Sequence, residues 1–256
     1  MQASQRIAVA GATGRVGRHI VDVLEERGHA VVPIARSTGV NVVTGEGLAE
    51  ALTGVDAVID AATPPTPDEQ VATDFFTADA RNLQELGTKG GVERIVLVSI
   101  IGIDDFTEGY QAAKQVQERE TLSGPIAAQI LRAAQFHEFV EELVEWGTQD
   151  GVSYIPKMRT QLVAARTVAE ELADLATTSE PGAPGSISEI AGPREENLVD
   201  VAKLLVERRG NPTRVEAVSN PDDPATELYE HGSLLPGPDA TLAGPTFEQW
   251  LNEQAA

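Results

Sequence analysis

The feature that most constrains this chain is a glycine-rich turn close to its start, set between an apolar run and an amphipathic pattern. Residues 7–10 are apolar, and Gly11, Gly14 and Gly17 follow at intervals of three. Beyond the turn, apolar residues recur at helical spacing: Val16, Ile20, Val21, Val23 and Leu24. This order predicts a strand, a turn and a helix, which together form the opening unit of an α/β fold.

Each glycine has a physical role in such a turn. Gly11 allows the tight exit from the strand, Gly14 lets the backbone approach a pyrophosphate, and Gly17 lets the helix pack close to the sheet. The N–H groups of the first helical turn then face the phosphates. The spacing differs from the commoner Gly-x-Gly-x-x-Gly, so an ordinary glycine turn is the alternative, but its place on the first strand favours dinucleotide binding. The residues expected to hold the dinucleotide here are Gly11, Thr13, Gly14, Arg15, Val16 and Gly17.

The end of the second expected strand, over residues 30–35, indicates which dinucleotide is bound. Sites that prefer NAD usually place Asp or Glu there, where the carboxylate binds the ribose hydroxyls. This chain has Arg36 instead, followed by Ser37. A guanidinium suits a 2′-phosphate, which it grips with paired hydrogen bonds, so the pattern favours NADP(H) over NAD(H). The alternative is a solvated surface arginine.

Composition limits the remaining possibilities. With 256 residues, 41% of them hydrophobic, we expect a single NAD(P)-binding domain over 1–256, in which residues 151–256 contribute a small C-terminal lobe. A net charge of −21 argues against nucleic acid as a partner, and an acidic surface with no evident apolar seam favours a monomer. No apolar run is long enough to span a membrane, and no export leader is evident, which predicts a cytoplasmic protein. The chain has no cysteine, and no metal-ligand spacing is present.

The other segments alternate between strand and helix patterns. Residues 56–61 predict a buried parallel strand, whose small following residues Ala62 and Thr63 leave room for a ligand. Residues 40–43 are expected to form a short strand, and residues 221–242 to be mostly loop. Further strands are expected over 94–99, 125–131, 151–157, 186–191 and 213–218, and helices over 47–52, 68–87, 109–122, 139–144, 162–176, 198–209 and 246–252. The fold class is therefore α/β, a Rossmann-type doubly wound and mostly parallel sheet.

One pair of residues on the expected helix 109–122 has the chemistry of a proton donor. Tyr110 and Lys114 are four residues apart, so they share a helix face. A neighbouring lysine charge lowers the pKa of a tyrosine hydroxyl, which then donates a proton to a carbonyl as hydride arrives. Ser99, at the end of a strand, is placed to polarise that carbonyl. Taken alone, the pair is more often a plain Tyr–Lys pair on a solvated helix.

Several segments together resemble a known family. They are Gly-Ala-Thr-Gly-Arg-Val-Gly at 11–17, Ala-Arg-Ser-Thr-Gly at 35–39, Val-Leu-Val-Ser-Ile at 96–100, the Tyr110–Lys114 pair, and later segments at 131–137, 191–194, 232–238 and 246–251. They are similar to the NmrA-like, NAD(P)-binding branch of the atypical short-chain dehydrogenases/reductases, over nearly the whole chain. The resemblance implies NADP across the carboxyl edge of the sheet, with Tyr110 as general acid and Lys114 as its ribose-binding partner. Where the superfamily often has a second Ser or Thr, this chain has Ile100.

The resemblance leaves two functions open. The first is an NADP(H)-binding oxidoreductase that transfers hydride to a small carbonyl or quinone-like acceptor. The second is a non-catalytic NADP-binding redox sensor or regulator that acts through protein contacts. In either case Gln135, Phe136 and His137, after the strand at 125–131, are expected to roof the nicotinamide and shape a substrate pocket. His137 has a capping or core-edge role as its more ordinary alternative.

Overall fold

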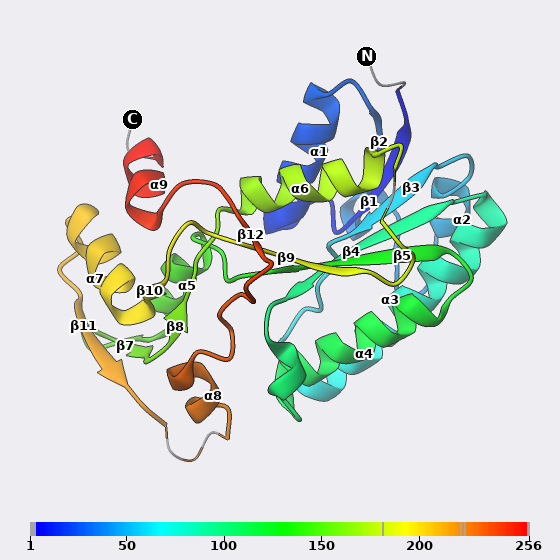
Figure 1. The fold of residues 1–256 in the computed structure, drawn as a ribbon. Coiled ribbons are helices and arrows are strands. Elements are labelled where there is room, and N and C mark those ends of the chain that lie inside the picture. The colour runs from blue at the N-terminus through cyan, green and yellow to red at the C-terminus, as the bar shows by residue number, and fades with distance from the viewer. Residues whose placement is uncertain (1–3, 181, 221, 223, 255–256) are drawn as a thin grey trace. The chain divides into compact units, whose positions relative to one another are not determined.

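The computed structural model describes residues 4–180, 182–220, 222 and 224–254, and Figure 1 shows its course. The chain divides into two compact units. The first unit comprises Met1–Ser99, Phe106–Arg132 and Val168–Ser188, and the second comprises Ile100–Asp105, Ala133–Thr167 and Glu189–Ala256. Each unit is described by itself. In the described residues, no helix is both long enough and apolar enough to cross a bilayer.

A seven-stranded sheet has the order β12-β9-β5-β4-β3-β1-β2. Its strands are β1 (Arg6–Ala10), β2 (Ala30–Ile34), β3 (Ala57–Asp60), β4 (Arg94–Ile100), β5 (Ala127–Ala133), β9 (Ile187–Ala191) and β12 (Thr241–Leu242). The strand β1 pairs in parallel with both β2 and β3, with Ile7 opposite Val31 and Ala57. Consecutive strands therefore lie on opposite sides of β1, which creates the reversal of strand order where doubly wound folds bind ligands. The expected α/β fold class is confirmed.

Helices cover the sheet of the first unit. They are α1 (Arg15–Glu26), α2 (Leu48–Ala51), α3 (Glu69–Gly90), α4 (Gly109–Ser123) and most of α6 (Ala165–Thr177), with a short 3-10 helix at Arg36–Thr38. A second 3-10 helix, Ile103–Asp105, belongs to the second unit. The helix α3 begins where the Asp68 carboxylate accepts a hydrogen bond from Val71 N–H, and it ends at Gly91 in the left-handed conformation. Figure 1 shows α3 and α4 side by side, in extensive contact along their length.

The core of the first unit lies between the sheet and these helices. Fully or almost fully buried aliphatic side chains from strands and helices meet there: Ile34, Leu48, Leu52, Val58, Leu83 and Ile95. Burying each such side chain contributes about 1.5–3 kcal/mol, which accounts for the continuous apolar runs in the central strands.

The second unit has its own small core. Its elements are α5 (Phe139–Trp146), β6 (Thr148–Gln149), β7 (Val152–Pro156), β8 (Arg159–Thr160), β10 (Glu196–Asn197), α7 (Leu198–Arg208), β11 (Arg214–Val218), α8 (Thr226–His231) and α9 (Phe247–Gln254). Three strands form a sheet in the order β11-β7-β6, and β10 pairs with β8. The apolar stripe of α9, made of Phe247, Trp250 and Leu251, is buried in this core as its pattern predicts.

Three segments differ from expectation. Residues 40–43 do not form a strand. Residues 42–44 form a turn, because the Asn41 carboxamide oxygen accepts hydrogen bonds from Val43 and Thr44 N–H and the Asn41 carbonyl oxygen accepts one from Gly45 N–H. The helix expected from residue 162 begins at Ala165, whose N–H donates to the Glu138 carboxylate. The stretch 221–242 contains α8 and β12 in addition to loop, although residues 221 and 223 lie outside the described residues.

Candidate functional site: a dinucleotide cavity and a buried Tyr–Lys group

A cavity of about 410 Å³ opens in the first unit at the carboxyl ends of β1, β2 and β3. Six residues predicted to bind the dinucleotide line it: Gly11, Thr13, Gly14, Arg36, Ala62 and Thr63. They come from three segments far apart in the sequence, which the parallel sheet brings to one edge. The predicted residues Arg15, Val16, Gly17, Ser37 and Lys114 are not among the described residues that line this cavity. Val16 and Gly17 are buried in the first turn of α1, which places them behind the cavity wall.

The glycine turn fits the close approach of a phosphate group. A Cβ on Gly11 would lie 2.5 Å from the Ala61 carbonyl oxygen, and a Cβ on Gly17 would overlap the Gly11 carbonyl group. A Cβ on Gly14 would meet only the Gly11 carbonyl oxygen, at 3.1 Å, and otherwise enter open space. Gly11 and Gly17 therefore serve the packing of the turn, whereas Gly14 keeps the backbone at the cavity accessible.

The start of α1 favours an anionic ligand. Gly14 is its N-cap residue, with no side-chain cap, and no acidic residue lies in the first turn. Helix N-termini usually attract Asp or Glu because the N–H groups and the helix dipole are positive there. Their absence leaves this end of the helix free to receive phosphate groups.

Arg36 lies on the cavity wall, directly after β2. The short 3-10 helix that holds it is fixed by Thr38, whose hydroxyl accepts a hydrogen bond from Ala35 N–H at 3.1 Å. Within the part of the chain that the structure describes, Arg36 forms no ion pair. An exposed guanidinium on the wall of a cavity, with no carboxylate to neutralise it, is suited to a phosphate.

The segment 40–43 was missed as part of this site. Val40, Asn41, Val42 and Val43 all line the cavity. The Asn82 carboxamide of α3 donates hydrogen bonds to the carbonyl oxygens of Val42 and Val43, at 2.7 and 2.8 Å, and so holds the turn in place. The sequence signal was Asn41, a residue that favours turns, but the apolar residues around it indicated a strand.

The structure brings Tyr110 and Lys114 together around one aromatic ring. The Tyr110 and Phe76 ring centroids are 5.7 Å apart, and Lys114 Nζ lies 4.7 Å from the centroid of the same Phe76 ring. Phe75, which lines the cavity, packs edge-on against Phe76 at 5.7 Å. Two adjacent phenylalanines of α3 therefore connect the cavity wall to the Tyr–Lys group.

The pKa of Tyr110 is opposite to expectation. Burial, with a smaller effect of the Asp60 charge, raises the pKa of Tyr110 to about 12. The Tyr–Lys spacing had predicted a lowered pKa for this hydroxyl. Burial also lowers the pKa of Lys114 to about 8, against the attraction of Asp60, Asp79 and Glu118. The prediction failed because helix spacing identifies neighbours on one helix, whereas burial and Asp60 come from the packing of other elements.

Ser99 is the penultimate residue of β4, and its side chain is 3% exposed. Its hydroxyl oxygen has no hydrogen-bond partner among the described residues. A buried hydroxyl without a partner is uncommon and leaves a donor and an acceptor available. Ile100, which follows it, is half-buried at the end of the strand.

A buried polar cluster lies beside this group and was missed by sequence reasoning. Its members are Asp60 of β3, Asp79 of α3 and Lys114 and Gln117 of α4, all at most 4% exposed. The Lys114 ammonium donates to Gln117 Oε1 at 2.5 Å, and Gln117 Nε2 donates to Asp60 Oδ2 at 2.9 Å. Nothing in the local pattern distinguishes Asp79 or Gln117 from solvated helix positions, so only the packing of α3 on α4 identifies them.

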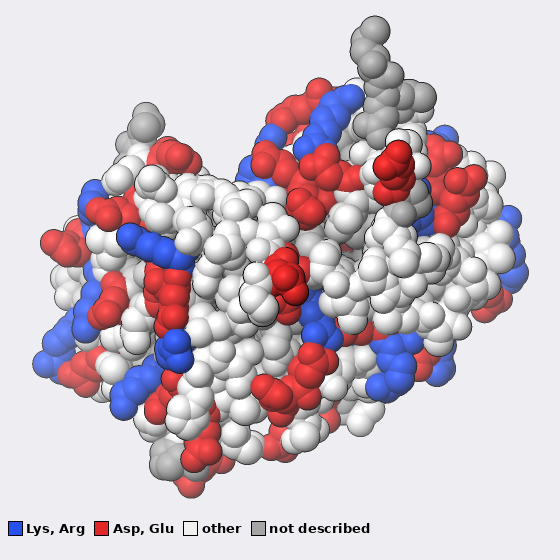
Figure 2. Space-filling view, in the orientation of Figure 1, with Lys and Arg blue, Asp and Glu red and all other residues white. Residues whose placement is uncertain are grey.

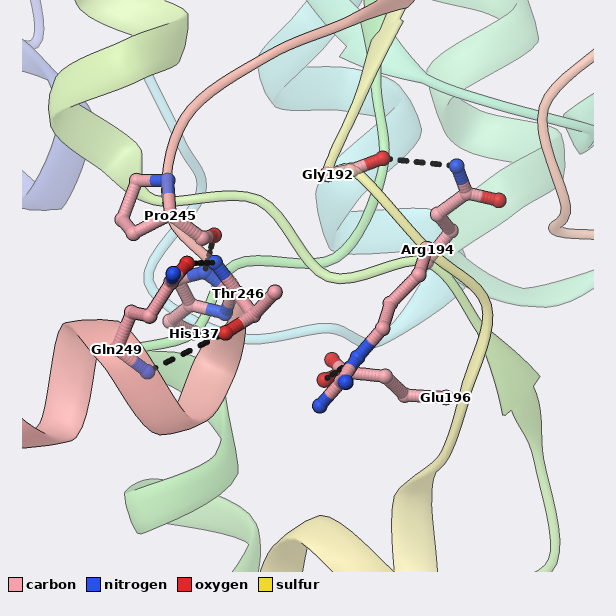
Figure 3. A network of polar contacts seen from close by, with 8 residues as sticks. His137, Gly192, Arg194, Glu196, Pro245, Thr246 and Gln249 are labelled. Carbon is pink, nitrogen blue, oxygen red and sulfur yellow. Dashed lines mark hydrogen bonds and ion pairs between the residues drawn. The ribbon is translucent and has the colours of Figure 1, made fainter.

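Gln135, Phe136 and His137 belong to the second unit and make contacts within it. The Gln135 side-chain oxygen accepts a hydrogen bond from the Thr160 hydroxyl at 2.7 Å, and Phe136 forms a backbone bridge to Val163. His137 is completely buried, and its Nε2 lies 3.1 Å from the Pro245 carbonyl oxygen, a contact drawn in Figure 3. Because a carbonyl only accepts, Nε2 carries the proton.

The His137 ring is packed as a core residue of the second unit. Its centroid lies 5.5 Å from both the Phe247 and the Trp250 rings of α9. Burial lowers the pKa of His137 to about 4, so the ring is neutral at physiological pH. Figure 3 also shows the neighbouring Thr246–Gln249 contact and the Arg194–Glu196 ion pair, the latter at 3.5 Å. In this position His137 anchors the start of α9.

Comparison with known proteins agrees with this geometry. A family model described as NAD(P)H-binding matches residues 11–139, about half of the chain, from the glycine turn to the start of α5. The photosystem II assembly factor Ycf39 of Synechocystis is 26% identical over 238 residues, which cover 83% of this chain and 70% of that protein.

Two solved structures share the fold at low identity. A short-chain dehydrogenase/reductase superfamily protein from Agrobacterium tumefaciens with bound NAD has a TM-score of 0.71 at 16% identity, covering 98% of this chain and 96% of the other. The NADPH-dependent quinone oxidoreductase QOR2 of Escherichia coli, complexed with NADPH, has a TM-score of 0.68 at 18% identity, covering 98% and 100%.

The doubly wound sheet and the glycine turn at its switch point define a Rossmann-type, dinucleotide-binding protein. The chain belongs to the NAD(P)H-binding family, as the resemblance of its segments predicted.

Proposed function

We propose that this protein is an NADPH-dependent oxidoreductase that reduces a small carbonyl or quinone-like acceptor. The observation that carries the proposal is the cavity in which the glycine turn and Arg36 face the same space. Gly14 and the start of α1 receive the pyrophosphate, while Arg36 binds the 2′-phosphate that distinguishes NADP(H) from NAD(H). The E. coli quinone oxidoreductase QOR2, a structural neighbour, binds NADPH.

The chemical step follows from the residues around Phe76. When bound, NADPH supplies the hydride. The Tyr110 hydroxyl donates a proton to the oxygen of the acceptor, and the Lys114 ammonium stabilises the phenolate that remains. The Ser99 hydroxyl, buried and without a partner in the described chain, is available as a hydrogen-bond donor to the acceptor oxygen. A tyrosine with a raised pKa holds its proton until the acceptor oxygen takes on charge.

A second function is favoured by a specific relative. The similarity to an assembly factor, over 83% of this chain, supports an NADP-binding regulator that acts through protein contacts and turns over no substrate. The position of Ile100, where the superfamily often has a second hydroxyl, is consistent with this alternative. Under either function we propose that the protein is a monomer with a small-molecule dinucleotide as its ligand.

Titration with NADPH and NADH, followed by nicotinamide fluorescence, tests the cofactor site. We expect wild type to bind NADPH more tightly than NADH. Arg36→Ala is expected to weaken NADPH binding at least tenfold and to leave NADH binding unchanged, because only NADPH carries the 2′-phosphate. Arg119→Ala is the matched control, since Arg119 is exposed on the same unit and does not line the cavity. Equal affinity of both dinucleotides for wild type would contradict the NADP preference.

A further inference from the structure

The buried cluster of Asp60, Asp79, Lys114 and Gln117 contains two acids and one base with no access to solvent. Asp60 is 1% exposed and Asp79 is 0% exposed. Both carboxylates meet the same Gln117 amide nitrogen, Asp60 Oδ2 at 2.9 Å and Asp79 Oδ2 at 3.3 Å. Two buried carboxylates that converge on one donor do not both ionise, because their repulsion and the loss of hydration favour one shared proton. A neutral acid, a carboxylate and an ammonium then give the cluster no net charge.

The hydrogen bonds indicate which acid carries the charge. Asp60 Oδ1 accepts from Ala62 N–H at 3.0 Å, and Asp60 Oδ2 accepts from Gln117 Nε2 at 2.9 Å. Asp79 Oδ2 receives only a longer contact from the same Nε2, at 3.3 Å, and Asp79 Oδ1 has no partner in the described residues. A carboxyl that accepts more N–H bonds is stabilised as the anion. Asp60 is therefore the carboxylate and Asp79 the acid.

The charges around Lys114 come from three elements. Asp60 of β3 and Asp79 of α3 face the ammonium, and Glu118 lies on its own helix α4. Glu118 is already bound by Arg132 of β5, at 2.7 and 2.9 Å. Tyr110, the other titratable group on this side, is also faced by Asp60. Asp60 is thus the charge that is left to balance Lys114.

We propose that Asp60 and Asp79 share one proton, held on Asp79, and that Asp60 is the positioning residue that holds the Lys114 ammonium, through Gln117, against the Phe76 ring that Tyr110 also contacts. Asp60 also accepts a hydrogen bond from the N–H of Ala62, which lines the dinucleotide cavity. The same carboxylate therefore links the cavity floor to the helix that carries Tyr110 and Lys114. The proposal rests on the proposed function for the role of Lys114, but its geometry is independent of turnover.

The four lysines of the chain make a direct test practicable, because labelling lysine at Cε gives four NMR signals. In the 256-residue chain without cofactor, the signal that Lys114→Met removes is expected to titrate near pH 8. Asp60→Asn is expected to lower this midpoint by about one unit or more, since it removes the balancing charge. Asp79→Asn replaces a neutral acid by a neutral amide and is expected to shift the midpoint much less. Asp74→Asn, an exposed position on α3, is the control.

A larger shift with Asp79→Asn than with Asp60→Asn, or no shift with either, would overturn the proposal. Should Asp60→Asn fail to fold, aspartate labelled at Cγ in wild type decides the question. We then expect one buried carboxyl, assigned to Asp79 by Asp79→Asn, to stay protonated at pH 7 while Asp60 is ionised; the opposite assignment would overturn the proposal.

Activity separates this proposal from the proposed function. In an active enzyme, Asp60→Asn is expected to lower kcat more than it raises KM, and to shift the pH profile of kcat in the direction of the Lys114 midpoint. Loss of activity with an unchanged pH profile and an unchanged Lys114 titration would reduce Asp60 to a structural role. The Lys114 titration could shift in Asp60→Asn although the wild-type protein oxidises NADPH with none of the acceptors tested. That result would refute the oxidoreductase function and leave the proposed positioning of Lys114 intact.

Discussion

Gly11 and Ala61 both line the cavity, and their backbones approach each other too closely to admit a side chain on Gly11. A Cβ on Gly11 would lie 2.5 Å from the Ala61 carbonyl oxygen, and Gly11 has a φ of +74°. Two independent constraints therefore require glycine at this position: a left-handed backbone conformation and the close approach of the segments that follow β1 and β3.

The first prediction concerns this contact. Gly11→Ala is expected to lower the free energy of unfolding by about 3 kcal/mol, through backbone strain and overlap with Ala61. Gly28→Ala is the matched control, because Gly28 has a φ of +82° but a Cβ there would meet nothing within 4 Å. Strain alone is expected to cost about 1–2 kcal/mol at that position. Urea unfolding measures both, and an equal loss would show that the Ala61 contact is unimportant.

A second prediction compares a buried with an exposed ion pair. Arg132 and Glu118 form a two-point contact with side chains 9% and 8% exposed. Arg132→Met is expected to destabilise the protein by about 3–5 kcal/mol, because it leaves a buried carboxylate without its partner. Arg81→Met breaks the solvent-exposed pair with Glu120 and is expected to change stability little. A small effect of Arg132→Met in chemical denaturation would contradict this account.

The third prediction uses the burial of His137. The unfolded chain binds a proton at this residue near pH 6.5, whereas the folded protein binds it only near pH 4. Stability therefore falls as the pH falls from 6.5 to 4, by about 3 kcal/mol in all, and this contribution changes no further below pH 4. His137→Gln is expected to flatten the dependence between pH 7 and pH 5 in urea unfolding. An unchanged slope in this variant would show that other groups cause it.

A fourth prediction follows from the net charge of −21. Acidic side chains are spread over the face seen in Figure 2 and are not gathered in one patch. Their mutual repulsion destabilises the compact state, and salt screens it, so the thermal midpoint is expected to rise between 0.05 M and 1 M KCl. Sucrose, which carries no charge, serves as the control for general exclusion effects at equal osmolality. A thermal midpoint that rises equally in KCl and in sucrose would show that charge screening does not cause the increase.

Much of the fold followed from local pattern. The sequence predicted β1, β3 and β4 because these strands are buried and their residues are apolar in continuous runs. It predicted α9 because the apolar residues there recur at helical spacing and form the buried face of the helix. The glycine turn predicted the cavity for the same reason, since Gly14 and Gly17 meet constraints within one strand–turn–helix unit, whereas the contact of Gly11 with Ala61 comes from the segment after β3.

The rest depends on contacts between residues far apart in the chain. Asp60 meets Gln117, 57 residues away, and His137 meets Pro245, 108 residues away. No local period reports such partners. The predicted direction of the Tyr110 pKa shift was wrong because the burial of Tyr110 and the Asp60 charge come from elements outside α4. Asn41 is the opposite case, because the sequence itself contained the signal. Asn favours turns, but the apolar residues around it led to the prediction of a strand.

The central claim is tested most directly by NADPH oxidation with a panel of quinones and small carbonyl compounds, measured for wild type and Tyr110→Phe with NADPH binding determined for both. We expect wild type to oxidise NADPH with at least one acceptor, and Tyr110→Phe to lose at least about a hundredfold in kcat while it still binds NADPH, because only the proton donor is removed. A wild-type protein that binds NADPH and oxidises it with no acceptor, or a Tyr110→Phe variant as active as wild type, would contradict the account.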